Sequence, residues 1–315
     1  MTKRIDENSA GVFVIAPTPF KPDGALDLDS ARTMCDFYLD KGASGLTILG
    51  IMGEAPKLDP AEATQFTATV LDQVGGRVPV IVGVSSPSLK ALGDLAYQSM
   101  DQGAAGVMVA PMPSLKTDDA IYGYYAQAID VLGDIPVCLQ DYPQTLGVYF
   151  SASLLGRIFK AFPTICMLKH EDSPGLAKLS RFRELCLTEI GRKVSILVGN
   201  GAMHLPQEMA RGADGAMTGF AFPEMLVQVV DLFKAGEADR AETLFDAYLP
   251  LVRHELQPGL GLAARKYVLS RRGAIAHDTL RAPGPKLAAA DVAEIEHLWK
   301  RLERRLDELR AQGVL

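Results

Sequence analysis

Short apolar runs recur along the chain, and longer segments with helical spacing separate them. Three of these runs follow the same phrase of small residues, Gly-Ala-x-Gly, within residues 41–49, 102–110 and 211–219. The first glycine of the phrase suits the position after a helix, and the second permits close packing as a strand begins. Five further runs of strand length complete the set, at residues 11–17, 78–83, 135–140, 164–169 and 194–199. The pattern predicts eight βα units.

The eight runs are continuously apolar rather than alternating, which is typical of parallel strands buried on both faces. The segments between them carry helix start signals, with Asp59 and Ser151 as expected N-caps and Pro60 as an expected first helical residue. The segments expected to be helical include residues 27–41, 60–74, 89–102 and 151–161. Eight successive units favour an α/β fold of the closed (β/α)8 TIM-barrel type over a doubly wound open sheet. No Gly-x-Gly-x-x-Gly follows the first run, and no P-loop occurs.

After Phe222 the apolar pattern has helical spacing only. The helical stretches expected there are residues 226–234, 238–256, 260–270 and 288–311. The first stretch is expected to close the barrel as its eighth helix, and the others to form an appended bundle. We therefore predict a barrel catalytic domain over residues 1–236 and a C-terminal helical bundle over residues 237–315.

Composition narrows the range of partners. Hydrophobic residues make up 48% of the chain and charged residues 22%, and the net charge is −6. This balance is typical of a globular protein and argues against nucleic acid as a partner, because no basic stripe is present. No apolar stretch approaches the roughly 20 residues needed to span a bilayer, and no secretory segment follows Met1. The cysteines form no Cys-x-x-Cys pair, so we expect a cytoplasmic protein without a membrane partner.

The residues that could carry chemistry are expected at the carboxyl ends of the strands, where active sites of such barrels lie. Lys169 ends an apolar run, so its stem begins inside the predicted barrel. Burial disfavours the charged form of a lysine, and a neutral amine can attack a carbonyl carbon. The simpler alternative is an ion pair with Glu171 or Asp172 at the barrel rim.

A second candidate feature is the turn from Gly50 to Glu54. Its Gly-x-x-Gly spacing leaves several backbone N–H groups able to converge on an anion such as a carboxylate, although a tight turn alone would also explain it. His170 is a possible base beside Lys169, although a histidine on a loop is more often structural. No spacing of His, Cys, Asp or Glu suggests zinc, so we expect neither a metal nor a cofactor.

Taken together in order, these motifs resemble the dihydrodipicolinate synthase/N-acetylneuraminate lyase family over nearly the whole chain. The matching features are Thr18-Pro19-Phe20, Gly50-x-x-Gly53-Glu54-Ala55, Pro143-x-x-x-Gly147 and Lys169 at the end of the sixth strand. The resemblance implies that Lys169 forms a Schiff base with pyruvate or another 2-oxo acid, whose carboxylate the Gly50–Gly53 turn would hold. It also implies a homo-oligomer, a dimer or a tetramer.

The chain departs from the family pattern at the positions that shuttle protons. Members that make dihydrodipicolinate usually carry two hydroxyl residues inside the turn, a tyrosine and an arginine around the fifth-strand proline, and an aromatic pair after the fourth strand. The residues at these positions are Ile51 and Met52, Gln140 and Thr145, and Met112-Pro113. A glutamine cannot shuttle protons at neutral pH. The departures therefore place dihydrodipicolinate synthesis in doubt.

We interpret the chain as a Schiff-base-forming lyase, an aldolase or a dehydratase, that acts on pyruvate or a hydroxylated 2-oxo acid such as a 2-keto-3-deoxy sugar acid. A synthase with a replaced relay and a catalytically silent 2-oxo-acid sensor remain as alternatives. The polar residues available for proton transfer are Tyr142, Asp141, His170, Glu171 and Asn200. The residues assigned to catalysis are Lys169, Gln140 and Tyr142, and those assigned to substrate binding are Thr18, Gly50, Ile51, Met52, Gly53, Glu54, Gly199, Asn200 and Thr218.

Overall fold

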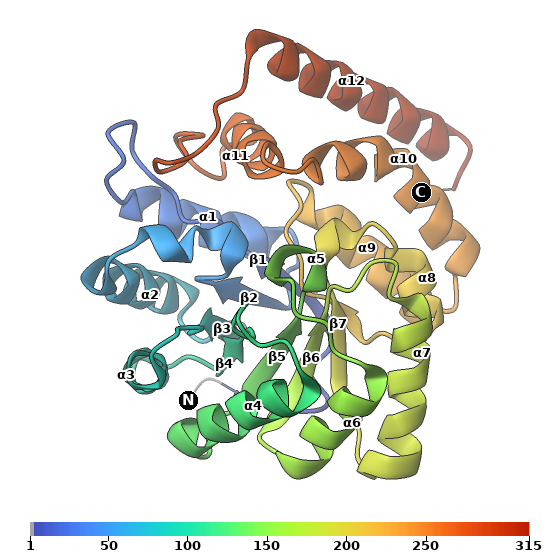
Figure 1. Cartoon of the computed structure of the whole chain (residues 1–315). Coiled ribbons are helices and arrows are strands. Elements are labelled where there is room, and N and C mark those ends of the chain that lie inside the picture. Colours follow the sequence, from blue (N-terminus) through green and yellow to red (C-terminus); the bar gives the residue numbers. More distant parts are fainter. Residues whose placement is uncertain (1–2, 315) are drawn as a thin grey trace.

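Eight parallel strands close into a barrel in the computed structural model, which describes residues 3–314 (Figure 1). The strands are β1 (Gly11–Ile15), β2 (Gly45–Ile48), β3 (Val80–Gly83), β4 (Gly106–Val109), β5 (Val137–Asp141), β6 (Ile165–His170), β7 (Ser195–Val198) and β8 (Gly215–Ala216). Strand β1 pairs with both β2 and β8, so the sheet has no open edge. The closed barrel confirms the predicted fold and excludes the open sheet.

Helices follow the strands, and all but the short α5, which lies at the mouth, cover the outside of the barrel (Figure 1). They are α1 (Leu28–Asp40), α2 (Pro60–Val74), α3 (Leu89–Asp101), α4 (Asp118–Leu132), α5 (Pro143–Leu146), α6 (Ala152–Ala161), α7 (Leu176–Leu185), α8 (Leu205–Ala210) and α9 (Pro223–Lys234). The predicted caps are confirmed, because the side chains of Asp59 and Ser151 accept hydrogen bonds from the first turns of α2 and α6. Gly42 and Gly103 have φ angles of 84° and 101°, as predicted for residues that end a helix.

The core has an outer layer between strands and helices and a smaller inner layer inside the barrel. The inner layer contains Met167 of β6 and Cys138 of β5. Because side chains alternate along a strand, residues two and four positions after Met167 share its inward direction. Lys169 and Glu171 therefore face the barrel interior, whereas Leu168 belongs to the outer layer.

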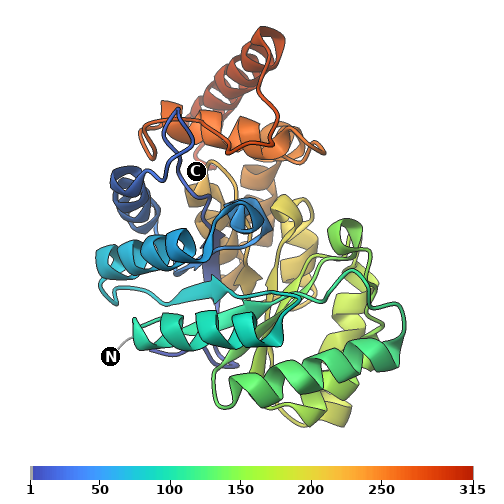
Figure 2. The same cartoon turned by 60° about the vertical axis from the view of Figure 1, so that its left-hand side comes forward.

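Three helices follow the barrel in the chain: α10 (Ala238–Glu255), α11 (Gly261–Arg271) and α12 (Ala289–Ala311). They lie together at one end of the barrel, as the orange and red helices of Figures 1 and 2 show. This is the end at which the strands finish, because Lys266 of α11 donates a hydrogen bond to the carbonyl oxygen of Thr18, beyond β1. The helices thus form a roof over the mouth of the barrel. The division of the chain at residue 236 stays a prediction.

Within residues 3–314, no helix combines the length and the apolar character required to pass through a bilayer.

Candidate active site

Lys169 lies near the end of β6, with its side chain directed into the barrel. Only 4% of its surface is exposed. Its Nζ atom lies 3.0 Å from Oε2 of Glu171, two residues further along. Strand β5 places Gln140 directly beside Lys169 in the parallel register. Lys169 and Glu171 are both nearly buried, so little solvent screens the contact between their charged groups.

Glu171 is fixed by contacts from two neighbouring strand ends. Nε2 of Gln140 donates a hydrogen bond of 2.6 Å to Oε2, and the backbone N–H of Asn200 donates one of 3.4 Å to Oε1. Gly199 lies against the side chain, because a Cβ atom there would be 2.3 Å from Cγ of Glu171. Any residue other than glycine at position 199 would therefore displace the carboxylate from Lys169.

The cavity above this pair has a volume of ≈ 420 Å³ and opens between the strand ends and the roof helices. The residues predicted as site residues that line it are Ile51, Met52, Tyr142, Lys169, Asn200 and Thr218. Glu171 also lines it, together with Glu255 and Arg265 from the roof. These six predicted residues follow or end five different strands, and the fold brings them together around one cavity.

The turn after β2 forms a short 3-10 helix, η1 (Ile51–Gly53). The N–H groups of Gly53 and Glu54 bond back to the carbonyl oxygens of Gly50 and Ile51. The first N–H groups of such a helix, those of Ile51 and Met52, have no partner inside it. They lie on residues that line the cavity and are suited to hold a carboxylate.

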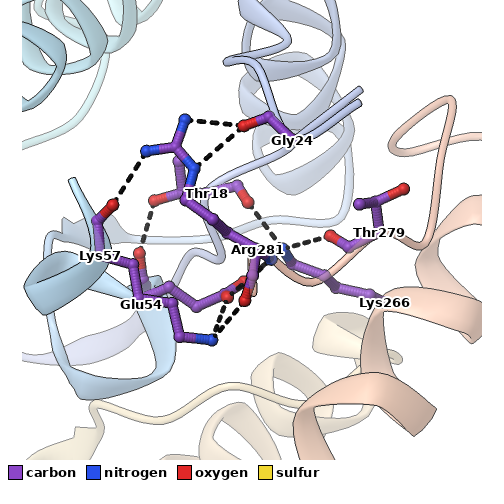
Figure 3. Close-up of polar contacts among 8 residues, drawn as sticks. Thr18, Gly24, Glu54, Lys57, Lys266, Thr279 and Arg281 are labelled. Carbon is purple, nitrogen blue, oxygen red and sulfur yellow. Dashed lines mark hydrogen bonds and ion pairs between the residues drawn. The ribbon is translucent and has the colours of Figure 1, made fainter. Parts of the chain in front are cut away.

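Thr18 holds this turn from below rather than lining the cavity. Its Oγ1 atom donates a hydrogen bond of 2.6 Å to the carbonyl oxygen of Gly53 (Figure 3). The carbonyl oxygen of Thr18 in turn accepts a hydrogen bond of 2.7 Å from Nζ of Lys266. Thr18 therefore links the turn to helix α11 of the roof.

Glu54, which is predicted to bind substrate, is not among the residues that line this cavity. Both carboxylate oxygens are engaged away from the cavity, Oε1 by Lys266 at 2.6 Å and Oε2 by Lys57 at 2.8 Å (Figure 3). The backbone N–H of Arg281 also donates to Oε2. Burial lowers the pKa of Lys266, and the charge of Glu54 opposes that shift. Glu54 therefore serves to position the turn, because its carboxylate is already paired.

Two other candidates for proton transfer, Asp141 and His170, point away from the mouth. Oδ2 of Asp141 lies 2.7 Å from Nζ of Lys178 on the outer helix α7. The Nε2 atom of His170 is 3.1 Å from the carbonyl oxygen of Gly175. Strand alternation explains both positions, since each residue neighbours one that faces inward. Neither residue is therefore placed to transfer a proton in the cavity, although both were among the polar residues available near the strand ends.

Tyr142 does line the cavity, at the start of helix α5. Burial raises the pKa of its phenol, and a hydrogen bond with Thr145 opposes the rise. The nearby charges of Glu171 and Arg265 also act on it in opposite directions. The phenol therefore stays protonated at neutral pH and can donate a hydrogen bond to a bound molecule.

The polar residues of the cavity differ in how far sequence patterns identify them. Glu171 was considered as an ion-pair partner of Lys169 and as a residue available for proton transfer, and its position two residues after Lys169 on one strand was the signal for a shared direction. Arg265 and Glu255 carried no such signal, because only the folded roof brings them to the mouth. Among residues 3–314, no group of three His, Cys, Asp or Glu side chains is placed to hold a metal ion.

Comparison with known proteins identifies the relatives of this barrel. A model of the dihydrodipicolinate synthetase family matches residues 8–302. The chain belongs to this family. Membership confirms the resemblance inferred from the motifs and the expectation of a class I lyase that works through a Schiff base.

The relatives within this family are named for two different activities. The L-2-keto-3-deoxyarabonate dehydratase of Azospirillum brasilense is 32% identical, over 96% of this chain and 97% of that protein. A 4-hydroxy-tetrahydrodipicolinate synthase of Methanococcus maripaludis is 28% identical, over 77% of this chain and 82% of that protein. The solved structure of a dihydrodipicolinate synthase from Rhodopseudomonas palustris is 48% identical, with a TM-score of 0.93 over 95% of this chain and 100% of that chain.

Proposed function

We propose that this family member dehydrates a 2-keto-3-deoxy sugar acid, with Lys169 as the Schiff-base lysine and Glu171 as the group that moves protons. The observation that carries the proposal is the buried contact of 3.0 Å between Lys169 Nζ and Glu171 Oε2. A base in direct contact with the amine can take its proton before the amine attacks the C2 carbonyl. The same carboxylate then lies beside C2 and C3 of the covalent intermediate.

The chemistry follows from this placement. The Lys169 amine adds to C2, water leaves, and an iminium ion forms, while the substrate carboxylate lies on the Ile51 and Met52 N–H groups. Glu171 removes a proton from C3, which gives an enamine. The enamine electrons then form a C3–C4 double bond conjugated with the restored iminium ion and expel the C4 hydroxyl. This hydroxyl leaves as water with the proton that Glu171 took from C3, while the phenol of Tyr142 donates a hydrogen bond to it. Hydrolysis of the iminium ion returns Lys169, so the net change is the loss of one water molecule.

The residues around Glu171 favour this reaction over condensation with an aldehyde. Ile51 and Met52 supply no hydroxyl, and Gln140 cannot carry a proton at neutral pH. Gln140 instead donates a hydrogen bond to Glu171, which fixes the carboxylate beside Lys169. Gln140 and Lys169 therefore both contact the carboxylate of Glu171, the proposed acid–base group. The dehydratase relative, which matches over nearly its whole length, supports the same choice.

The competing candidate is dihydrodipicolinate synthesis, which the name of the 48% identical structure suggests. We expect the protein to turn over a 2-keto-3-deoxy sugar acid at least about 10²-fold faster than pyruvate plus aspartate semialdehyde, the scale of a missing acid–base relay. Steady-state rates on both substrate sets, with trapping of a pyruvate adduct by borohydride as the common control, decide between them. A synthase rate equal to or above the dehydratase rate would contradict the proposal. A trapped adduct without turnover of any substrate would indicate the 2-oxo-acid sensor.

We also propose that the protein is a cytoplasmic homo-oligomer. The four cysteines are buried and unpaired in the described part of the chain, which suits a reducing compartment. Large apolar side chains are exposed at Tyr149, Leu187 and Tyr97, with 68%, 85% and 50% of their surface accessible. Such side chains are normal on a protein surface when they are scattered singly, so the proposal of a homo-oligomer rests on membership of the family.

The oligomer is expected to persist at micromolar concentration, where light scattering should give a mass of two or four chains. The aromatic pair that family members usually carry after the fourth strand is replaced by Met112-Pro113, so no aromatic side chain from this position is expected to reach the site of a partner subunit. A monodisperse monomer under these conditions would contradict the assembly but not the chemistry at Lys169.

A further inference from the structure

Arg265 is a buried charged residue at the cavity that the proposed Schiff-base chemistry does not use. It lies on helix α11 of the roof, and only 3% of its surface is exposed. Its Nε atom donates a hydrogen bond of 2.9 Å to Oε2 of Glu255 on helix α10. Its Nη1 atom is also buried but has no hydrogen-bond partner among residues 3–314. A buried donor without a partner is unfavourable, so the guanidinium has capacity for a further acceptor.

The position of the guanidinium is fixed by the backbone after β8. A Cβ atom at Gly219 would lie 2.1 Å from Nη1 and 2.8 Å from Cζ, so the guanidinium rests on a surface that only glycine provides. In the barrel β8 is separated from β6 by β7 alone. Arg265 and Lys169 therefore reach the same cavity, one from the roof and the other from the wall.

Tyr142, Glu171 and Arg265 line the same cavity. The space between Lys169 and the roof is thus bordered by a hydrogen-bond donor at Tyr142 and by the guanidinium of Arg265, whose buried Nη1 has no partner among residues 3–314. A 2-oxo acid that is bound through C2 at Lys169 and through its carboxylate at the Gly50–Gly53 turn has its remaining carbons in this space.

We infer that the guanidinium of Arg265 binds a hydroxyl group at the distal end of the substrate and so selects sugar acids with a hydroxylated tail. The inference rests on the proposed function, since it presumes that C2 of the substrate is attached to Lys169. The fixed partner of the guanidinium decides the kind of tail. Glu255 already balances the charge of Arg265 and is itself held by the backbone N–H of Ala221. A tail with a second carboxylate would bring another negative charge beside Glu255, which a neutral hydroxyl does not.

The test compares substrates that share the reacting carbons and differ at the tail. The wild-type protein should process 2-keto-3-deoxyarabonate, with a terminal hydroxyl, about 10- to 100-fold better in kcat/KM than 4-hydroxy-2-oxopentanoate, with a terminal methyl group, the range expected for a hydrogen bond to a charged donor. A 2-keto-3-deoxy acid with a terminal carboxylate should also be disfavoured. A wild-type preference for the methyl or the carboxylate tail would overturn the inference.

Arg265→Lys is the first variant, because the shorter ammonium can still pair with Glu255 but lacks the remaining N–H groups of the guanidinium. The hydroxyl-to-methyl preference should fall to near unity in this variant. Arg265→Met combined with Glu255→Gln is the second, because it removes both charges and keeps an acceptor for Ala221. An unchanged preference in either folded variant would overturn the role of Arg265.

Borohydride trapping of pyruvate separates this inference from the proposed function. Pyruvate has no tail, so both Arg265 variants should trap it as completely as the wild-type protein. If the wild-type protein fails to trap pyruvate, the Schiff-base proposal itself is wrong. If trapping is retained while tail preference does not change, only the assignment of Arg265 is wrong.

Discussion

Lys169→Ala is expected to abolish both the borohydride-trapped adduct and turnover, with a loss of at least about 10⁴-fold in kcat, as for removal of other covalent nucleophiles. Lys169 is the lysine that lines the cavity beside Glu171, and no other lysine lines that cavity in the described part of the chain. Mass spectrometry of the protein after incubation with pyruvate and borohydride measures the adduct directly. A retained adduct in the alanine variant would contradict the assignment of the nucleophile.

Two further substitutions make this result specific. Lys169→Arg keeps a positive charge next to Glu171, so the fold should be preserved, but a guanidinium remains protonated and cannot attack a carbonyl. Lys90→Ala removes an exposed lysine that pairs with Asp94 on the surface of α3 and should leave the adduct unchanged. Circular dichroism melting of all three variants shows whether loss of the adduct reflects chemistry or unfolding.

The barrel could be predicted from sequence because its signals are local and repeat eight times. Each strand is a short, continuously apolar run, and several helices begin at a recognisable cap such as Asp59 or end at a glycine such as Gly42. A closed barrel is the arrangement that buries eight such runs on both faces. The order of the elements therefore carried most of the information about the fold.

The site could be predicted only in part, because the direction of a side chain depends on strand parity. Lys169 was identified from its place after an apolar run. Its neighbour His170 was considered as a possible base, but the side chain of His170 points outward. Glu171 shares the direction of Lys169, and the rule of alternation would have favoured it over His170. Asp141 points outward for the same reason, since Gln140 takes the inward position on β5.

Other roles depended on contacts between distant parts of the chain. Glu54 follows the Gly50–Gly53 turn directly, but its carboxylate forms an ion pair with Lys266 of α11 outside the cavity. The same helix brings Arg265 to the mouth of the barrel. Helix α11 has little amphipathic pattern because residues on several of its sides are buried, including these two charged ones. Such ionic contacts have no counterpart in local sequence patterns, so they became visible only in the fold.

Glu171→Gln is expected to lower the rate of sugar-acid dehydration by about 10²- to 10⁴-fold, the usual range for loss of a positioned acid–base group. The substituted amide retains the size of the side chain and can still accept a hydrogen bond from Gln140 or Asn200. It cannot take a proton from C3 or from the Lys169 amine. The variant should therefore still form a trappable adduct with pyruvate, although more slowly, because a water molecule can remove the amine proton.

Exchange of the pyruvate methyl protons in D2O isolates the step assigned to Glu171. The exchange requires the Schiff base and then removal of a proton from C3, so proton NMR measures enamine formation without the loss of a hydroxyl group. Glu171→Gln should slow this exchange by a factor similar to that for dehydration, whereas Tyr142→Phe should leave exchange nearly unchanged and affect only dehydration of the sugar acid. If Tyr142→Phe instead abolishes the exchange while Glu171→Gln retains it, the base is the tyrosine, and Glu171 has only the role of an ion-pair partner for Lys169.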